Sequence, residues 1–221
     1  MRRSARIVLY LGATALIALA GGAALLVNQT KVGTAAIQSA VTRTEGMIAR
    51  AWQLPAASAF QGEVIWQSNA SMCGPASVAN ALRSLGESAV SESAVLAGTG
   101  RCWTGICMLG LTLDELAGVA RTKTNRSVTV LRDLTPAEFL VHLRRSNETG
   151  RRYIINFNRK EIFGAGSGHH APIGGYLEAE DLVFVLDVNR DYRPWLVERA
   201  RLFAAMDTQD GARKRGMLLI E

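Results

Sequence analysis

One cysteine in the chain has the sequence surroundings of a nucleophile. Cys73 stands directly before Gly74 and Pro75 and begins a segment in which apolar residues recur with helical spacing. Unpaired amides and the macrodipole at a helix N-terminus favour the thiolate, which is the reactive form of cysteine. Taken alone, Cys73 could equally be a small buried apolar residue, since free cysteine is among the most buried residue types.

Two histidines and an aspartate offer the partners that a nucleophilic cysteine needs. His169 and His170 enter one predicted strand, and Asp187 lies near the end of the next. With the intervening turn centred between Ala179 and Glu180, His169 is about three positions from facing Asp187, a gap that a side chain can close. The histidine can then share the thiol proton, and the carboxylate can orient the histidine.

Gln67 lies six residues before Cys73 and is the candidate oxyanion donor. Its side-chain amide can act beside the backbone amide of Cys73, although Gln67 could also be a solvated polar residue. We interpret Cys73, His169, Asp187 and Gln67 together as the catalytic residues of an enzyme that uses a cysteine nucleophile.

The helices that must position these residues come early in the chain. Apolar spacing predicts a helix over 73–85, and Gly86 can end it in the left-handed conformation. Capping boxes, in which a threonine is followed three residues later by a glutamate, predict further helices over 112–121 and 135–145.

Strands follow the helices. Residues 153–158, 171–177 and 182–188 are rich in β-branched and aromatic side chains, and the last two ranges should form an antiparallel hairpin. A short amphipathic helix over 199–206 and a strand over 216–220 complete the chain. The order predicts an α+β fold, with an N-terminal helical part and a C-terminal antiparallel sheet.

The beginning of the chain predicts export. Residues 7–27 are almost wholly apolar behind three arginines, and a helix of this length can span a bilayer. The length favours an uncleaved anchor over a cleaved signal peptide, for which Ala18 and Ala20 provide small residues. The arginines place the N-terminus inside. Residues 1–28 are therefore predicted to be a signal anchor or signal peptide, and in a bacterium the domain would be anchored to the inner membrane and periplasmic, or secreted to the periplasm after cleavage.

Composition and charge limit the classes of function that the chain can have. The 221 residues are 48% hydrophobic and 20% charged, as in a folded globular chain. Three of the 25 basic residues precede the apolar segment, and the other 22 nearly balance the 19 acidic residues. Basic residues are interleaved with polar residues and not with aromatic ones, so we expect no nucleic-acid partner. Residues 29–56 are predicted to be a connector, as a stalk or first helix, and residues 57–221 to be the catalytic domain.

The remaining cysteines do not suggest a metal site. Cys102 and Cys107 lack the paired spacing of zinc ligands, and in an oxidising space they could form a disulfide or remain separate buried thiols. His142, on a predicted helix, is interpreted as a surface residue. We expect no cofactor and no structural metal.

Several motifs resemble the phytochelatin synthase family. They are QSNASMCGPASVANALRSLG at 67–86, RRYIINFNRK at 151–160, GSGHHAPIGGY at 166–176, LDVNRDYRPW at 186–195, and MDT followed by RGMLLI at the end. The resemblance covers about 54–220 and is to the short bacterial type, without the cysteine-rich C-terminal region of the plant enzymes. It implies a papain-like fold and a Cys-His-Asp triad.

By motif match, Cys73 is the nucleophile, His169 the base, Asp187 its orienting group and Gln67 the oxyanion donor. The family usually has an aromatic or aliphatic residue where this chain has His170. Side chains alternate along a strand, so His170 is expected to point to the opposite face from His169 and away from the thiol.

The resemblance also implies a reaction. The Cys73 thiolate would attack the Cys-Gly bond of glutathione, releasing glycine and leaving a γ-glutamylcysteinyl thioester for hydrolysis or for transfer to a second glutathione. Arg190 is the candidate for binding the anionic substrate, though it could instead form a surface ion pair, and heavy-metal ions would enter as substrate thiolates. The alternatives are an exported cysteine peptidase like the bacteriocin-leader-processing domains, and a membrane-tethered binding module with an inactive triad.

Overall fold

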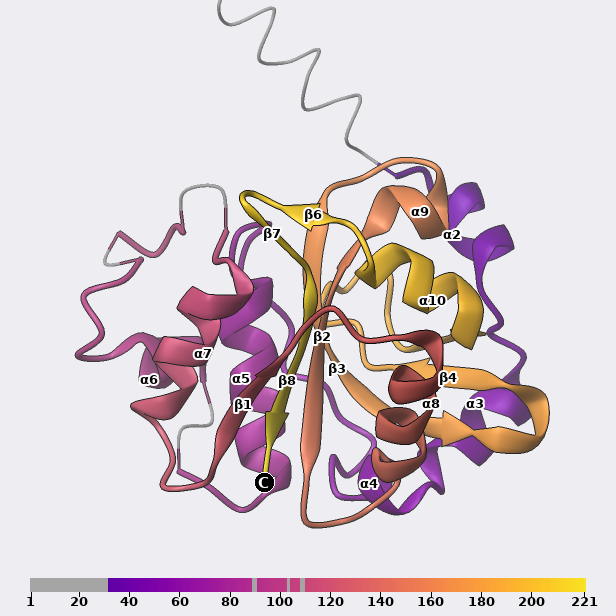
Figure 1. Ribbon diagram of the computed structural model, residues 1–221, viewed down its shortest axis with the longest axis horizontal. Coiled ribbons are helices and arrows are strands. Elements are labelled where there is room, and N and C mark those ends of the chain that lie inside the picture. Colours follow the sequence, from indigo (N-terminus) through magenta and orange to yellow (C-terminus); the bar gives the residue numbers. More distant parts are fainter. Residues whose placement is uncertain (1–31, 89–90, 103, 108–109) are drawn as a thin grey trace, which may run out of the picture.

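The domain is built around an antiparallel sheet (Figure 1). The computed structural model describes residues 32–88, 91–102, 104–107 and 110–221. Its six-stranded sheet has the order β1-β8-β2-β3-β4-β5. The strands are β1 (Val128–Leu131), β2 (Arg152–Asn158), β3 (Gly168–Leu177), β4 (Leu182–Val185), β5 (Trp195–Glu198) and β8 (Gly216–Ile220), with β6 (Gln209–Asp210) and β7 (Arg213–Lys214) as a separate pair.

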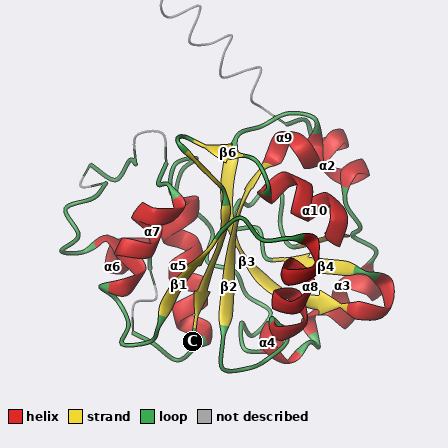
Figure 2. Cartoon of the chain, viewed as in Figure 1, coloured by secondary structure: helices red, strands yellow, loops and turns green. Residues whose placement is uncertain are grey.

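Helices cover both faces of this sheet (Figure 2). Those described are α2 (Thr34–Ala40), α3 (Glu45–Trp52), α4 (Pro55–Ser58), α5 (Cys73–Ser84), α6 (Glu92–Leu96), α7 (Leu113–Arg121), α8 (Pro136–Arg145), α9 (Arg159–Phe163) and α10 (Arg199–Met206). On β2, Ile154 packs with the residues of α5 and α7, whereas Ile155 and Phe157 pack with those of α8 and α10. This alternation follows from the two-residue period of a strand and divides the core in two.

The local signals at the helix ends are confirmed. Thr112 and Thr135 both form complete capping boxes, so α7 and α8 begin where predicted. Gly86 follows α5 with a φ of 80°, a conformation that glycine adopts without the strain of a side chain. The predicted hairpin is also present, because β3 and β4 pair antiparallel across a short 3-10 helix, Glu178–Glu180.

Several elements differ from the prediction. β1 and β5 were not predicted. Each is only four residues long, and hydrogen bonds to the neighbouring strand contribute much to its extended conformation. β4 ends at Val185 and not at 188, and a register shift between Ile173 and Gly175 moves the hairpin pairing. As a result, Asp187 lies just beyond the strand, and Leu186 donates its amide to the carbonyl of Pro172 at 2.9 Å.

The segment before the nucleophile packs on the sheet. Ile37 of α2 is buried in the core with α9 and α10, and Ala51 of α3 packs with Phe184 and Leu196 on the other face. Thr42 and Leu196 exchange backbone hydrogen bonds of 2.8 and 3.0 Å, so this segment lies along the outer edge of β5.

The predicted leader over 1–28, including the apolar residues 7–27, lies outside the described residues. None of the helices in the described part of the chain is both long enough and apolar enough to cross a membrane.

Candidate active site

Cys73 is the first residue of α5, as its sequence context predicts. It is 6% exposed and packs with Ala76 and Val188. The Ser77 hydroxyl, one turn later, lies 2.7 Å from the carbonyl oxygen of Cys73 and 3.0 Å from that of His170. α5 is thereby held directly against the start of β3.

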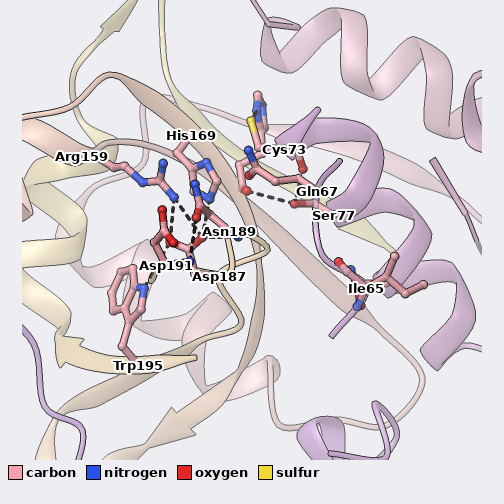
Figure 3. Close-up of polar contacts among 12 residues, drawn as sticks. Ile65, Gln67, Cys73, Ser77, Arg159, His169, Asp187, Asn189, Asp191 and Trp195 are labelled. Carbon is pink, nitrogen blue, oxygen red and sulfur yellow. Dashed lines mark hydrogen bonds and ion pairs between the residues drawn. The ribbon is translucent and has the colours of Figure 1, made fainter. Parts of the chain in front are cut away.

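His169 and Asp187 are joined by a buried hydrogen bond, shown in Figure 3. His169 Nε2 lies 2.8 Å from Asp187 Oδ1. The carboxylate also accepts hydrogen bonds from the Asn189 amide at 2.9 Å and Trp195 Nε1 at 3.3 Å, and Arg159 Nη2 lies 3.0 and 3.1 Å from its two oxygens. Five contacts therefore fix an aspartate that is completely buried.

The charges of these groups support one another. Burial alone would raise the pKa of Asp187, but Arg159 and His169 hold that pKa well below its usual range. Burial and Arg159 act to lower the pKa of His169, whereas Asp187 and the Cys73 thiolate raise it, and the net shift is upward.

The thiol follows the same pattern. Burial opposes ionisation of Cys73, but the charge and hydrogen bond of His169, together with a contribution from His170, hold the pKa of Cys73 well below its usual value. A lowered thiol pKa beside a raised histidine pKa describes a thiolate-imidazolium pair, the state in which a cysteine is nucleophilic at neutral pH.

His170 is placed differently from the expectation. Its Nδ1 lies 3.9 Å from Cys73 Sγ, so the prediction that only one of the two adjacent histidines can reach the thiol is wrong. The two rings do point to opposite sides of β3, with His169 against Phe157 on one side. Both reach the sulfur because Cys73 lies at the N-terminus of α5, beside the beginning of β3, where Gly168 starts the strand.

Gln67 lies beside Cys73 at the start of α5 (Figure 3). Its backbone amide donates to the carbonyl of Val188 at 2.8 Å, and its side-chain Nε2 donates to the carbonyl of Asn69 at 2.8 Å. One N–H of the side-chain amide remains available, and so do the backbone amides of Cys73 and Gly74, which have no acceptor among the described residues. Donors to an oxyanion are therefore present near the sulfur.

Arg190 is exposed and lies in the loop that follows Asp187. With Arg193 it lines two cavities, one of about 370 Å³ that also contacts Val64, and one of about 710 Å³ that also contacts Arg43. Val64 packs against the cluster that contains Cys73, although Cys73, His169 and Asp187 line neither cavity. Within the described residues, the side chains of Arg43, Arg190 and Arg193 make no ion pair of 4 Å or less.

Two arginines near the site were not predicted. Arg159 contacts Asp187, as described above, and its guanidinium lies 3.8 Å from the centre of the Tyr192 ring. Arg215 Nη1 lies 2.7 Å from Asn156 Oδ1 and 3.3 Å from Asp210, close enough for the Cys73 charge to act on it. No sequence spacing connects these arginines to the cysteine, because the sheet brings them together from distant segments.

The other predicted residues lie away from the thiol pair. Cys102 and Cys107 form a disulfide, which leaves Cys73 as the free cysteine of the chain. The Cys107 sulfur lies 3.6 Å from Met72, so the disulfide loop packs against the segment before the nucleophile. His142 is half-buried, with Nδ1 3.1 Å from the Tyr153 hydroxyl. Among the described residues, no group of three or more His, Cys, Asp and Glu side chains is arranged to hold a metal ion.

Solved structures support the predicted papain-like α+β fold. A C39-like peptidase from Bacillus anthracis superimposes with a TM-score of 0.52 and 14% sequence identity, over 73% of this chain and 95% of the peptidase. At this identity the likeness concerns the fold alone.

Curated relatives carry the name glutathione gamma-glutamylcysteinyltransferase. The chain is 40% identical to number 3 of Lotus japonicus over 73 residues, or 32% of this chain and 15% of the relative. It is 32% identical to number 1 of Triticum aestivum, over 50% of this chain and 23% of the relative, and 29% identical to the Schizosaccharomyces pombe protein, over 51% and 28%. The chain thus aligns with between 15% and 28% of the length of these relatives.

The wider match is to a family. The sequence model described as phytochelatin synthase matches residues 27–217, which include every residue of the thiol and histidine arrangement described above. This chain therefore belongs to the phytochelatin synthase family, a family of enzymes.

Proposed function

We propose that this protein cleaves the Cys-Gly bond of glutathione through a γ-glutamylcysteinyl thioester on Cys73. The observation that carries the proposal is the buried His169–Asp187 hydrogen bond beside the free Cys73 thiol at the start of α5. Membership of the phytochelatin synthase family and relatives named for γ-glutamylcysteine transfer support glutathione as the substrate.

In the first step, the Cys73 thiolate attacks the carbonyl carbon of the Cys-Gly peptide bond. The electron pair moves to the carbonyl oxygen, and the Gln67 side-chain amide and the Cys73 amide donate hydrogen bonds to this oxyanion. The C–N bond then breaks, and the His169 imidazolium gives its proton to the departing nitrogen of glycine. Asp187 holds the ring in the orientation that this transfer needs.

In the second step, His169 takes a proton from water, and the hydroxide attacks the thioester to give γ-Glu-Cys and the Cys73 thiolate. The α-amine of a second glutathione can replace water, and the product is then a phytochelatin of two repeats. We expect hydrolysis to dominate. Heavy-metal ions enter only as thiolates of the substrate, which would connect the reaction with metal detoxification.

The anionic substrate needs positive charge near the thiol. Arg190, Arg193 and Arg43 gather around adjoining cavities with no acidic partner within 4 Å among the described residues, which supports a role in holding substrate carboxylates. We assign Arg190 this role because it lines both cavities and follows Asp187 by only three residues.

The reaction is tested by incubating the full-length protein with glutathione and identifying the products by mass spectrometry, with Cys73→Ala as control. We expect γ-Glu-Cys and glycine to accumulate only with the intact thiol, and the ratio of γ-Glu-Cys to phytochelatin gives the balance of hydrolysis and transfer. Intact glutathione together with rapid alkylation of Cys73 would contradict this substrate.

The second candidate is an exported cysteine peptidase of the bacteriocin-leader-processing kind. The observation that favours it is the fold shared with a C39-like peptidase. A peptide library cleaved by the protein while glutathione stays intact would support this candidate. An inactive binding module would instead have a thiol with an ordinary pKa, which the surroundings of Cys73 do not favour.

We also propose that the domain functions outside the cytosol, anchored to the inner membrane through the N-terminal segment. The apolar sequence over 7–27 and the Cys102–Cys107 disulfide support this, because disulfides persist in oxidising compartments. Fractionation of cells that express the tagged protein tests it, and recovery in the cytosolic fraction would contradict it.

A further inference from the structure

A second histidine contacts the thiol, and the reaction described above does not use it. His170 is 3% exposed, and its Nδ1 lies 3.9 Å from Cys73 Sγ, within hydrogen-bond reach for sulfur. Its other ring nitrogen, Nε2, is buried and has no hydrogen-bond partner among the described residues. A buried polar atom without a partner is uncommon and needs a reason.

The backbone holds this ring in place from two sides. His170 pairs with Asn156 of β2 in the sheet, and its carbonyl oxygen lies 3.0 Å from the Ser77 hydroxyl of α5. The same hydroxyl contacts the carbonyl of Cys73. The positions of the thiol and of the His170 ring are therefore set by one connection between α5 and β3.

The surroundings of Nε2 indicate which nitrogen carries the proton. With the proton on Nε2, a buried N–H would have no acceptor, and buried N–H groups without acceptors are rarer than buried acceptors without donors. With the proton on Nδ1, the N–H points to the sulfur and is satisfied by the thiolate. The second arrangement leaves only a lone pair unpaired.

We propose that His170 is a further catalytic residue, whose Nδ1–H donates a hydrogen bond to the Cys73 thiolate while His169 carries the proton. This inference rests on the proposed role of Cys73 as nucleophile. His170 has no carboxylate partner among the described residues, in contrast to His169, which contacts Asp187. The two histidines thus have different roles: His169 transfers the proton, and His170 stabilises the sulfur anion.

The second donor matters at both ends of the reaction. It favours the thiolate before attack, and it stabilises the same thiolate when the C–S bond of the thioester breaks and the electron pair returns to sulfur. The charged or titratable groups around the pair are His169 on β3 and Arg215 beside β8, with Asp210 next to Arg215.

The test is the pH dependence of Cys73 alkylation by iodoacetamide in the full-length protein, read by mass spectrometry. The disulfide protects the other two cysteines. His170→Asn keeps a side-chain amide near the position of Nδ1, whereas His170→Gln places its amide near Nε2 and His170→Phe has no donor. His142→Phe is the matched control, because it removes a histidine that contacts Tyr153 and not the thiol.

We expect the alkylation midpoint to rise by about one pH unit in His170→Phe and His170→Gln, which slows labelling below the midpoint about tenfold. The alkylation midpoints of His170→Asn and His142→Phe should stay near that of the unchanged protein. All variants should label equally fast at high pH. Equal profiles for His170→Gln and the unchanged protein would overturn the proposal, and so would an equal shift in His170→Asn and His170→Gln.

Thermal unfolding of each variant identifies any that fail to fold, and the Asn and Gln pair decides the question if His170→Phe does not fold. Because alkylation needs no glutathione, the result stands even if glutathione proves to be the wrong substrate.

Discussion

At the scale of residues, the site is a set of charges that depend on one another. Asp187 keeps its negative charge although it is completely buried, because Arg159 and His169 lie against it. His169 in turn holds its proton because Asp187 and the Cys73 thiolate are close. Removing one charge therefore affects the other groups as well as the contact that is lost.

Replacing Asp187 with asparagine tests this dependence. The change removes the negative charge that raises the pKa of His169, and it leaves the Arg159 guanidinium buried without a counter-charge. We expect turnover to fall on the order of ten-thousandfold, and the free energy of unfolding to fall by about 3 kcal/mol. Steady-state kinetics and denaturant unfolding measure the two effects. The double variant Asp187→Asn, Arg159→Met should recover stability but not activity, and recovery of activity would contradict the assignment.

The pH profiles of labelling and turnover should differ. As pH falls through the lowered pKa of Cys73, the thiolate is protonated, so both alkylation and turnover decrease. As pH rises through the raised pKa of His169, the imidazolium loses its proton, so turnover decreases because the leaving amine has no acid, while the thiolate continues to react. We expect a bell-shaped curve for kcat/KM and a plateau for alkylation. Two curves that coincide on the alkaline side would contradict the role of His169.

At the scale of elements, close packing between neighbouring strands sets the tolerance for side chains. A Cβ atom added to Gly216 would lie 2.1 Å from the carbonyl oxygen of Leu131, which belongs to the backbone of β1. Gly118 lies on the exposed side of α7, where an added Cβ meets no atom within 4 Å. The same substitution should therefore have opposite effects at the two positions.

We expect Gly216→Ala to destabilise the protein by about 2 kcal/mol or more, because β8 must move away from β1. Gly118→Ala should raise stability by about 0.5 to 1 kcal/mol, since alanine loses less backbone entropy in a helix. Urea unfolding of both variants measures these differences. A loss of stability in both would show that the sheet contact is not the cause.

The elements also show what the sequence could predict. α7 and α8 begin at the predicted capping boxes, because such signals act within a few residues. β1 escaped prediction because its partner, β8, lies far away in the chain. The partner of β5 is the nearby β4, but β5 itself is only four residues long. The proximity of His169 to Asp187 could be predicted from a hairpin, whereas the contact of Arg159 with Asp187 depends on the loops at the end of the sheet. The prediction that His170 points away from the thiol was wrong. Alternation along a strand gives the face to which a side chain points, but it does not exclude contact with a thiol at the end of the strand.

At the scale of the whole molecule, the disulfide closes the loop that follows α6, and this loop packs against the segment before the nucleophile. Cys107 donates its backbone amide to the Ser71 hydroxyl at 3.0 Å and packs its sulfur against Met72. Asn69 Nδ2 donates to the carbonyl of Gly105 at 3.0 Å. The bond therefore stabilises a loop that supports the start of α5.

Replacing both cysteines of the disulfide with serine should lower the free energy of unfolding by about 2 kcal/mol, the loss expected for a short closed loop. The alkylation midpoint of Cys73 should change little, because neither sulfur contacts the thiol or its histidines in the described residues. Denaturant unfolding and alkylation of the double variant measure the two quantities. A large shift of the midpoint would show that the loop tunes the nucleophile as well as supporting it.

The pair of backbone hydrogen bonds between Thr42 and Leu196 has a further consequence for the molecule in solution. An open sheet edge offers unpaired amides and carbonyls to any other extended chain and is a common starting point for aggregation. Here Thr42, between α2 and α3, pairs with Leu196 on the outer side of β5. A chain shortened to begin after Thr44 would lose this pairing, and we expect it to associate with copies of itself, so the residues between α2 and α3 protect the β5 edge from pairing with another chain.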